Sequence, residues 1–413
     1  MPKLSQYELL NLLMQLGIML LAGRIMAEVA RKFKQPAVVG EIIAGILLGP
    51  TILGMMSPET FDMIFPSTES SLVLDGFVQV AVVMLLFVAG LEVDLHIVLQ
   101  QGRQAAFTSL FGLVIPFMFG FALPYLFPHF FGIADDGRRL AFALFMGTSM
   151  AITALPVIAR ILMDIGIFKT RMGMLIISSA MINDLIGWLI FSVVLGMIGK
   201  GHQNISLLNT VMLTIGFTAL MLTFGRGLIN RILPWINKKL AWPGGLLSLS
   251  LAMCFIAAAF TEYIGIHAIF GAFILGVAFG DSEHMSERAK EIIHQFINNI
   301  FAPLFFVAIG LRVNFLVNFD LMLTLVILVI AFAGKIIGSG YGTRLGGFTW
   351  KESLAAGFGM NARGAMEIIL GLIALENGLI NEKVFVSLVI MALITSMTSG
   401  PLMKWSLNRP WKD

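Results

Sequence analysis

The stretch SSAMINDLIGWLIFSVVLGM, residues 178–197, decides the fold because it places an acid inside a long apolar segment. Asp184 lies near the centre of the apolar run 171–199, so that ~20 Å of helix separates it from either end. A run of this length is enough to cross a lipid bilayer. A carboxylate at the bilayer centre costs about 2.5–3.5 kcal/mol on insertion scales. Asp184 therefore indicates an ion or proton site, and a structural acid paired to a neighbouring helix is the alternative.

The composition is that of a polytopic membrane protein. Hydrophobic residues make up 58% of the chain and charged residues 12%, whereas a soluble domain would carry roughly twice that charged fraction. The net charge of +3 then reflects basic residues at the membrane edges, and we expect no nucleic-acid partner. The single cysteine, Cys254, excludes disulfides within the chain, and the six scattered histidines show no ligand spacing. We expect a transporter without a cofactor, not an enzyme.

Hydropathy predicts an all-α fold with thirteen transmembrane helices. The predicted spans are residues 7–30, 36–54, 75–94, 104–127, 139–163, 171–199, 205–235, 246–263, 265–280, 290–312, 319–343, 352–376 and 383–404.

The basic residues predict the orientation of these spans. Most of the 27 lysines and arginines fall in one alternating set of loops, and the long loop 55–74 of the opposite set has none. The positive-inside rule places the N-terminus outside and the C-terminus in the cytoplasm, in a prokaryotic-type inner (plasma) membrane. Only a few polar residues follow the last span, so we expect no soluble regulatory domain in this chain.

Two pairs of similar segments predict an internal repeat. LLFVAGLEVDL (85–95) matches LFFVAIGLRVNF (304–315) with one inserted residue, and GEIIAGILLG (40–49) resembles GAFILGVAFG (271–280). Both matches are seven helices apart. Since seven is odd, helices 1–6 and 8–13 form inverted repeats joined by helix 7, an arrangement typical of secondary transporters.

The fifth helix of each repeat is interrupted near its middle. In helix 5 the break is TSMAITALPVIAR (148–160), with Thr153 and Pro156; in helix 12 it is FGMNARGAME (358–367), with Asn361 and Gly364. Irregular backbone at that depth is tolerated only where it is buried or lines a cavity. Paired broken helices predict a transport site at the midplane.

Three further charged residues lie inside predicted spans and are expected to compensate charge. Lys335 in helix 11 is flanked by small residues, which suggests close packing and an ammonium near the C-terminal end of a half-helix. Snorkelling to the surface is the alternative. Arg363 and Glu367 are four residues apart in helix 12 and can form a mainly structural pair.

The chemistry expected of Asp184 is exchange. A proton and a monovalent cation each neutralise the same carboxylate, so the two compete for one site. Asn183, Thr153 and the free carbonyls of the broken helices supply neutral oxygens for Na⁺ or K⁺, whereas the acids are too few for a divalent cage.

Seven segments of the chain together resemble one family of transporters. They are PAVVGEIIAGILLGP (36–50), MLLFVAGLEVD (84–94), TALPVIARIL (153–162), INDLIGW (182–188), HAIFGAFILGVAFGD (267–281), PLFFVAIGLRVNF (303–315) and GMNARGAMEI (359–368). In these motifs the chain is similar to the monovalent cation:proton antiporters of the second family, the Kef- and Nap-type exchangers, over residues 7–405.

This resemblance implies a homodimer and an elevator-type mechanism in which a core slides against a dimerisation domain. It implies a core at 104–199 and 319–406, a dimerisation side at 1–95 and 246–315, and a linker helix at 205–240. Asp184 matches the ion-binding aspartate of the family, and Lys335 matches its membrane lysine. Asn183 departs from members with two successive aspartates, which favours electroneutral exchange, although such exchangers often lack the lysine.

Three other functions stay open on the sequence. A sodium-coupled symporter of an organic solute shares paired broken helices, but few polar residues besides Asn361 and Arg363 are available to bind a solute. An ion channel lacks support because no filter-like loop is present. An intramembrane protease would need paired aspartates on adjacent helices or a serine–histidine pair.

Overall fold

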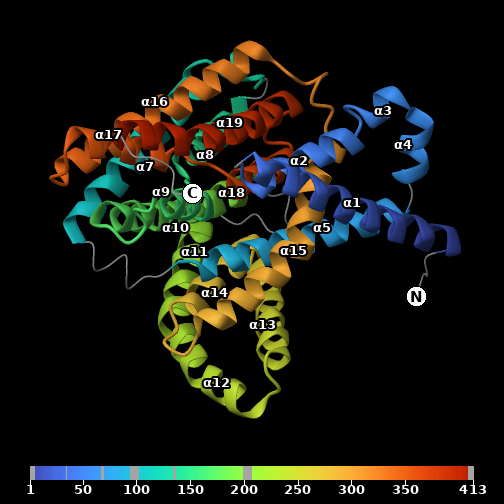
Figure 1. The fold of residues 1–413 in the computed structure, drawn as a ribbon, viewed down its shortest axis with the longest axis horizontal. Helices are drawn as coiled ribbons and strands as arrows, with labels where there is room; N and C mark the ends of the chain where they lie inside the picture. Colours follow the sequence, from blue (N-terminus) through green and yellow to red (C-terminus); the bar gives the residue numbers. More distant parts are fainter. Residues whose placement is uncertain are drawn as a thin grey trace. The chain divides into compact units, whose positions relative to one another are not determined.

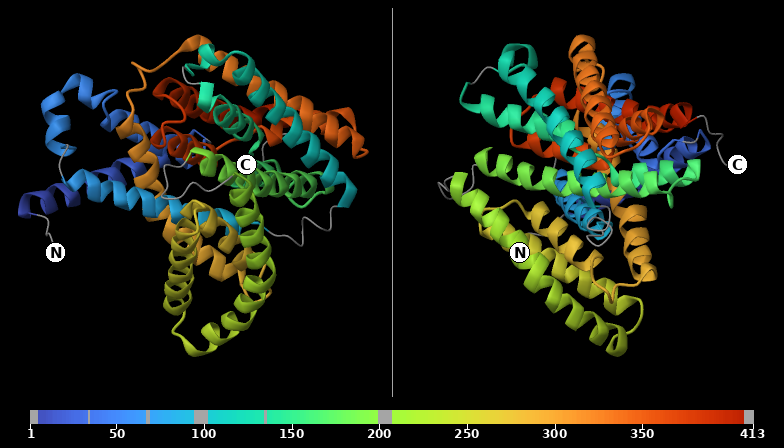
Figure 2. Two further views of the ribbon diagram at one scale, coloured as in Figure 1. Left: turned by 180° about the vertical axis from the view of Figure 1, so that it is seen from behind. Right: turned by 90° about the vertical axis from the view of Figure 1, so that its left-hand side faces the viewer.

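The computed structural model describes residues 5–33, 35–66, 69–93, 102–133, 136–198 and 207–407. Within these ranges every regular element is helical, as Figures 1 and 2 show. The α-helices are α1 (Gln6–Lys32), α2 (Ala37–Leu48), α3 (Leu53–Met56), α4 (Pro58–Ile64), α5 (Glu69–Leu91), α7 (Gly102–Leu126), α8 (Arg139–Ala151), α9 (Leu155–Ile165), α10 (Arg171–Ile198), α11 (Leu207–Leu220), α12 (Arg226–Lys239), α13 (Gly244–Tyr263), α14 (Ala268–Gly280), α15 (Glu287–Arg312), α16 (Leu321–Leu345), α17 (Trp350–Met360), α18 (Ala365–Glu376) and α19 (Glu382–Leu407). Short elements η1 (Pro128–Phe131), η2 (Asp136–Arg138) and η3 (Met221–Gly225) connect some of them.

The described helices confirm an all-helical polytopic membrane protein. Ten of them are long and apolar enough to cross a membrane, and α17 with α18, bent by 43°, makes an eleventh candidate span. The two remaining predicted spans, 139–163 and 265–280, are also helical but consist of shorter pieces, namely α8 with α9, and α14. Residues 94, 199 and 205–206 of the predicted spans lie outside the described ranges.

The chain divides into two compact units. The first unit comprises residues 1–91, 221–260 and 271–319, and the second comprises residues 92–220, 261–270 and 320–413. Asp184 and both interrupted helices belong to the second unit.

Glycines permit two very close helix crossings inside the first unit. A β-carbon on Gly45 of α2 would lie 2.2 Å from the carbonyl oxygen of Val307 in α15, against Gly310. A β-carbon on Gly276 of α14 would lie 2.2 Å from the carbonyl oxygen of Phe87 in α5, against Gly90. Only glycine fits at either crossing, because any side chain would overlap backbone atoms of the facing helix.

The second unit is organised around α7 and α16, which pack along each other. A β-carbon on Gly338 or on Gly342 would lie 2.4 Å from the carbonyl oxygens of Phe111 and Phe107, so the two backbones are in direct contact. Helix α8 packs on α7, while α17 packs on α16 and on α19, as Figure 1 shows for the last three helices. This packing brings both interrupted helices against the same central pair.

Candidate ion-binding site

The two interrupted helices cross at their breaks. The backbone leaves the helix at residues 152–154, between α8 and α9, and at residues 361–364, between α17 and α18. The N–H of Ala154 donates to the carbonyl oxygen of Ala362 at 2.9 Å. A β-carbon on Gly364 would lie 3.1 Å from Cβ of Ala154, so the two chains touch there. Each break therefore satisfies part of the backbone of the other.

The predicted break residues have distinct places. Pro156 lies in the first turn of α9, where a helix requires no backbone N–H, so it begins the second half-helix. Asn361 follows the last residue of α17, and Gly364 directly precedes α18. Both polar atoms of the buried Asn361 side chain lack a partner among the described residues.

Asp184 points its carboxylate at the N-terminal end of α9. The side chain is 1% exposed, and its Oδ1 accepts the backbone N–H of Thr153 at 3.2 Å. The free N–H groups and the dipole at a helix N-terminus stabilise an anion. The half-helix thus provides part of the compensation that a buried carboxylate needs, and the backbone N–H of Leu155 also bonds to this carboxylate.

Asn183 contacts α7. Its Oδ1 accepts the hydroxyl of Ser109 at 2.7 Å, and its Nδ2 has no partner among the described residues. The residue is fully buried. The structure therefore places Asn183 beside Asp184 in the chain but gives its amide a neighbour on a different helix.

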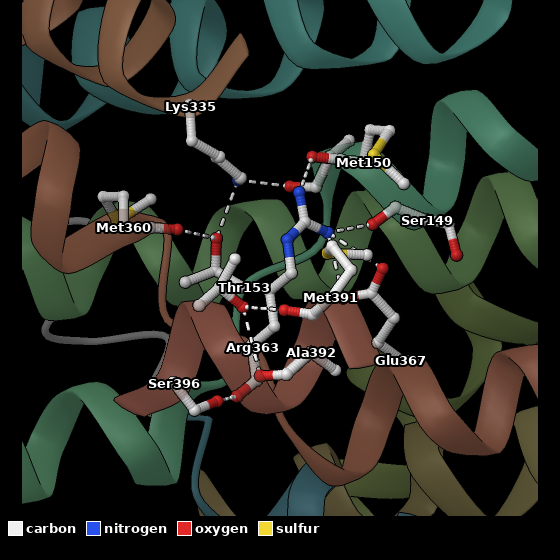
Figure 3. Close-up of polar contacts among 12 residues, drawn as sticks. Ser149, Met150, Thr153, Lys335, Met360, Arg363, Glu367, Met391, Ala392 and Ser396 are labelled. Carbon is white, nitrogen blue, oxygen red and sulfur yellow. Dashed lines mark hydrogen bonds and ion pairs between the residues drawn. The ribbon is translucent and has the colours of Figure 1, made fainter. Parts of the chain in front are cut away.

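Lys335 is fully buried and donates all three of its N–H bonds. They reach Oγ1 of Thr153 at 2.7 Å, the carbonyl oxygen of Gly112 at 3.1 Å and the carbonyl oxygen of Ala151. Ala151 is the last residue of α8, so the ammonium caps the C-terminal end of this half-helix. Figure 3 shows Lys335 approaching Thr153 from above.

Thr153 connects the charged groups of the site. Its hydroxyl accepts from Lys335 and lies 3.1 Å from the carbonyl oxygen of Met360, to which it donates. Its backbone N–H donates to Asp184. One residue in the first break therefore contacts the lysine, the acid and the end of α17.

Arg363 and Glu367 form a buried ion pair that also caps α8. The guanidinium Nη1 lies 2.9 and 3.0 Å from the two carboxylate oxygens, and Nη2 donates to the carbonyl oxygen of Met150 at 2.8 Å. Nη1 also donates to the carbonyl oxygen of Ser149. As Figure 3 shows, two cations thus cover the last three carbonyls of α8.

Oxygen atoms of the two interrupted helices lie at the same crossing as Asp184. In the described part of the chain no three His, Cys, Asp or Glu side chains converge on one point. The groups bonded to the carboxylate are backbone N–H groups, including that of Thr153, and the hydroxyl of the same residue and the Met360 carbonyl are hard oxygen atoms of the two helices that cross there.

The sequence did not single out three residues that complete this site. They are Ser109 and Gly112 on α7, which contact Asn183 and Lys335, and Ser396 on α19, whose hydroxyl donates to the carbonyl oxygen of Arg363. Ser109 and Gly112 lie one turn apart in an apolar span, and that spacing is the one available signal.

Comparison with known proteins places this arrangement in a family. A family model described as the transmembrane part of sodium/hydrogen exchangers matches residues 17–409. The chain is 33% identical over 397 residues to the Na⁺/H⁺ antiporter NhaS4 of Synechocystis, covering 95% of both chains. It is 30% identical over 423 residues to the K⁺/H⁺ antiporter 1 of Saccharomyces cerevisiae, covering 99% of this chain and 48% of that protein.

The fold also has a solved relative. The structure of the sodium proton antiporter MjNhaP1 from Methanocaldococcus jannaschii superposes with a TM-score of 0.66, covering 96% of this chain and 97% of the other. The two sequences are 17% identical, so this likeness concerns the fold.

Proposed function

The chain belongs to the sodium/hydrogen exchangers and is a cation/proton antiporter for Na⁺ or K⁺, and we propose that the single carboxylate of Asp184 carries either the cation or the proton. The observation that supports this most is the position of the carboxylate: buried, at the N-terminal end of α9 and at the crossing of two breaks. One carboxylate cannot be neutralised by both ions together. Exchange follows if only the neutralised site moves across the membrane.

We propose a ratio of one cation to one proton. Asn183 supplies an amide where a second carboxylate would add a charge, and this amide is bonded to Ser109 on α7. Lys335 keeps its three N–H bonds on Thr153 and on two carbonyls of the same unit. Since Asn183 and Lys335 each bond to groups other than Asp184, we expect the Asp184 carboxylate to be the group that changes its charge.

We propose that residues 104–199 and 319–406, which fall almost entirely in the second unit, are the moving core, and that residues 1–95 and 246–315, which fall mostly in the first unit, are the dimerisation side of a homodimer. The second unit holds every residue of the candidate site, and the first holds the glycine crossings. An elevator movement needs such a division, because the site must travel as one body. The linker of the proposed plan is the helical segment formed by α11 and α12.

The inverted repeat receives support from the glycine crossings. The repeat pairs Gly45 with Gly276 and Gly90 with Gly310. The crossing of Gly45 with Gly310 therefore corresponds to the crossing of Gly276 with Gly90. A β-carbon on Gly45 or on Gly276 would lie at the same distance, 2.2 Å, from a carbonyl oxygen of the facing helix. We propose thirteen crossings in all, with the N-terminus outside and the C-terminus in the cytoplasm.

The hydrogen bonds of Arg363 argue against symport of an organic solute. Its guanidinium is bound by Glu367 and by two α8 carbonyls, so it is not available to an anionic solute.

Transport by purified protein in liposomes tests the proposal. Proton flux is measured with an interior pH dye while Na⁺, K⁺ and Li⁺ are applied in parallel, with the membrane potential clamped by an ionophore for an ion other than the tested one. We expect cation-dependent proton flux at a rate that does not follow an imposed potential. No cation-dependent flux would refute the antiport, and a strongly voltage-dependent rate would refute the one-for-one ratio.

A further inference from the structure

Helix α7 contains a proline in its buried interior at the level of Lys335. Pro116 has no backbone N–H, so the carbonyl oxygen of Gly112, four residues earlier, has no helical donor. A proline ring also opens the helix around that carbonyl. Gly112 therefore presents a free acceptor inside an apolar span, where an acceptor without a partner is unfavourable.

Lys335 occupies this acceptor. Its Nζ donates to the carbonyl oxygen of Gly112 at 3.1 Å. Its other two N–H bonds go to Ala151 and Thr153, at the end of the first half-helix. The ammonium is fully buried and has three N–H groups, so each acceptor is needed to replace its lost water.

We propose that Pro116 is a positioning residue for Lys335: by withholding one N–H it frees the Gly112 carbonyl, which holds the ammonium where no acid at position 183 is available. Pro116 also lies next to the segment of α16 that carries Lys335. A β-carbon on Gly334, next to Lys335, would lie 2.8 Å from Cα and 2.9 Å from Cβ of Pro116, so α16 meets α7 at this proline. This role rests on the proposed antiport, because it supplies the charge that compensates the first break.

The substitution Pro116→Ala tests this role with little change in shape. Alanine keeps the Cα and Cβ atoms that face Gly334, while its N–H bonds to the Gly112 carbonyl and competes there with the ammonium of Lys335. We expect the initial rate of cation/proton exchange in liposomes to fall on the order of tenfold, the scale of one hydrogen bond to a charged group. Pro124→Ala is the matched control, since Pro124 is buried in the same helix but frees Gly120 instead. We expect that variant to stay within about twofold of the wild type.

A double-mutant cycle separates positioning from packing. In a Lys335→Met background the Gly112 carbonyl has no donor, so Pro116→Ala, which supplies an N–H, should leave the thermal unfolding midpoint unchanged or raise it. In the wild-type background it should lower the midpoint by about 2 °C. Equal shifts in both backgrounds would show that Pro116 acts through packing alone, and would overturn the proposal.

Replacing Pro116 with lactic acid by nonsense suppression isolates the N–H group. The resulting ester has the alanine side chain and, like proline, no N–H, so we expect near wild-type exchange. An inactive or unfolded ester variant would show that the ring itself is required and would overturn the proposal, even if Pro116→Ala fails to fold. Full activity of Pro116→Ala would overturn it as well. A wild-type protein without cation/proton exchange would instead refute the proposed function.

Discussion

The first unit contains two glycine crossings and the second contains two helix breaks, and the two crossings resemble each other more than the two breaks do. In the first unit the two crossings are chemically alike, because a β-carbon on Gly45 or on Gly276 would lie 2.2 Å from a carbonyl oxygen of the facing helix. In the second unit the two breaks differ in backbone conformation, since Ile152 is extended after α8 and Asn361 is helical after α17, and they also differ in charge. The end of α8 is capped by Lys335 and Arg363, whereas the end of α17 is closed by its own turn and by Thr153.

This contrast indicates which parts of a repeated fold are scaffold and which carry chemistry. Backbone contact through glycine depends on shape alone, so both copies can retain it. A bound ion needs one anion and a defined balance of charge, so the two breaks cannot be identical. The first break, with Asp184 at the start of α9, is the one we expect to carry the ion.

Removing the charge at the first break should have the largest effect. Asp184→Asn keeps an oxygen for the N–H of Thr153 but can neither release a proton nor neutralise a cation, so we expect exchange in liposomes to fall more than about 100-fold. Asp320→Asn is the matched control, because Asp320 also accepts a backbone N–H at a helix start, where asparagine caps equally well. Exchange by Asp184→Asn at the control rate would contradict the assignment.

Removing the guanidinium of Arg363, which lies in the second break and bonds to the end of α8, should mainly destabilise the fold. Arg363→Ala leaves the Glu367 carboxylate buried without its partner, a cost of about 3–5 kcal/mol. The exposed pair of Arg24 and Glu28 provides the comparison, and Arg24→Ala should cost less than about 1 kcal/mol. Thermal unfolding in detergent measures both. Similar midpoints for the two variants would mean that the buried pair is not a structural pair.

Alanine at either symmetric crossing should be equally harmful. Gly45→Ala and Gly276→Ala each force two backbones apart, which we expect to cost about 1–3 kcal/mol. Gly17→Ala in α1 meets no atom within 4 Å and should be neutral or slightly stabilising. Unequal losses at the two crossings, measured by thermal unfolding, would weaken the symmetry argument.

The hydroxyl that joins the two breaks should have the smallest effect of the four. Thr153→Val leaves one N–H of Lys335 and the carbonyl of Met360 without a partner, so we expect a loss of ~1–2 kcal/mol and a slower exchange. Thr153→Ser should restore most of the rate. Thr148→Val on α8 is the control, since that buried hydroxyl bonds only to Leu144 of its own helix. A control that is as slow as Thr153→Val would show that the connection between the breaks is not needed.

Much of this site could be predicted because its residues disturb an apolar pattern. Asp184, Lys335 and the polar residues of both breaks are each costly in a span, and the four-residue spacing of Arg363 and Glu367 indicates their pair. The structure places the ammonium of Lys335 at the end of a half-helix, as its small neighbours suggested.

The acceptor that α7 provides for Lys335, the Gly112 carbonyl, could not be predicted, since it depends on the rotation of α7 against α16. Gly112 and Ser109 are unremarkable in an apolar sequence, and their roles come from the helix they face. The predicted span 139–163 is divided into two helices for a different reason. A break removes residues from each half-helix, so neither α8 nor α9 reaches the length of a full span.

The backbone hydrogen bond from Ala154 to Ala362 joins the first break to the second. It ties both breaks into one joint, so if the second unit moves as one body, as we propose, the groups around Asp184 keep the same geometry on both sides of the membrane. The intrinsic dissociation constant for the cation should then be the same from either compartment at equal pH. Any directional preference of the exchanger would arise from the proton concentrations on the two sides, and not from two differently shaped sites.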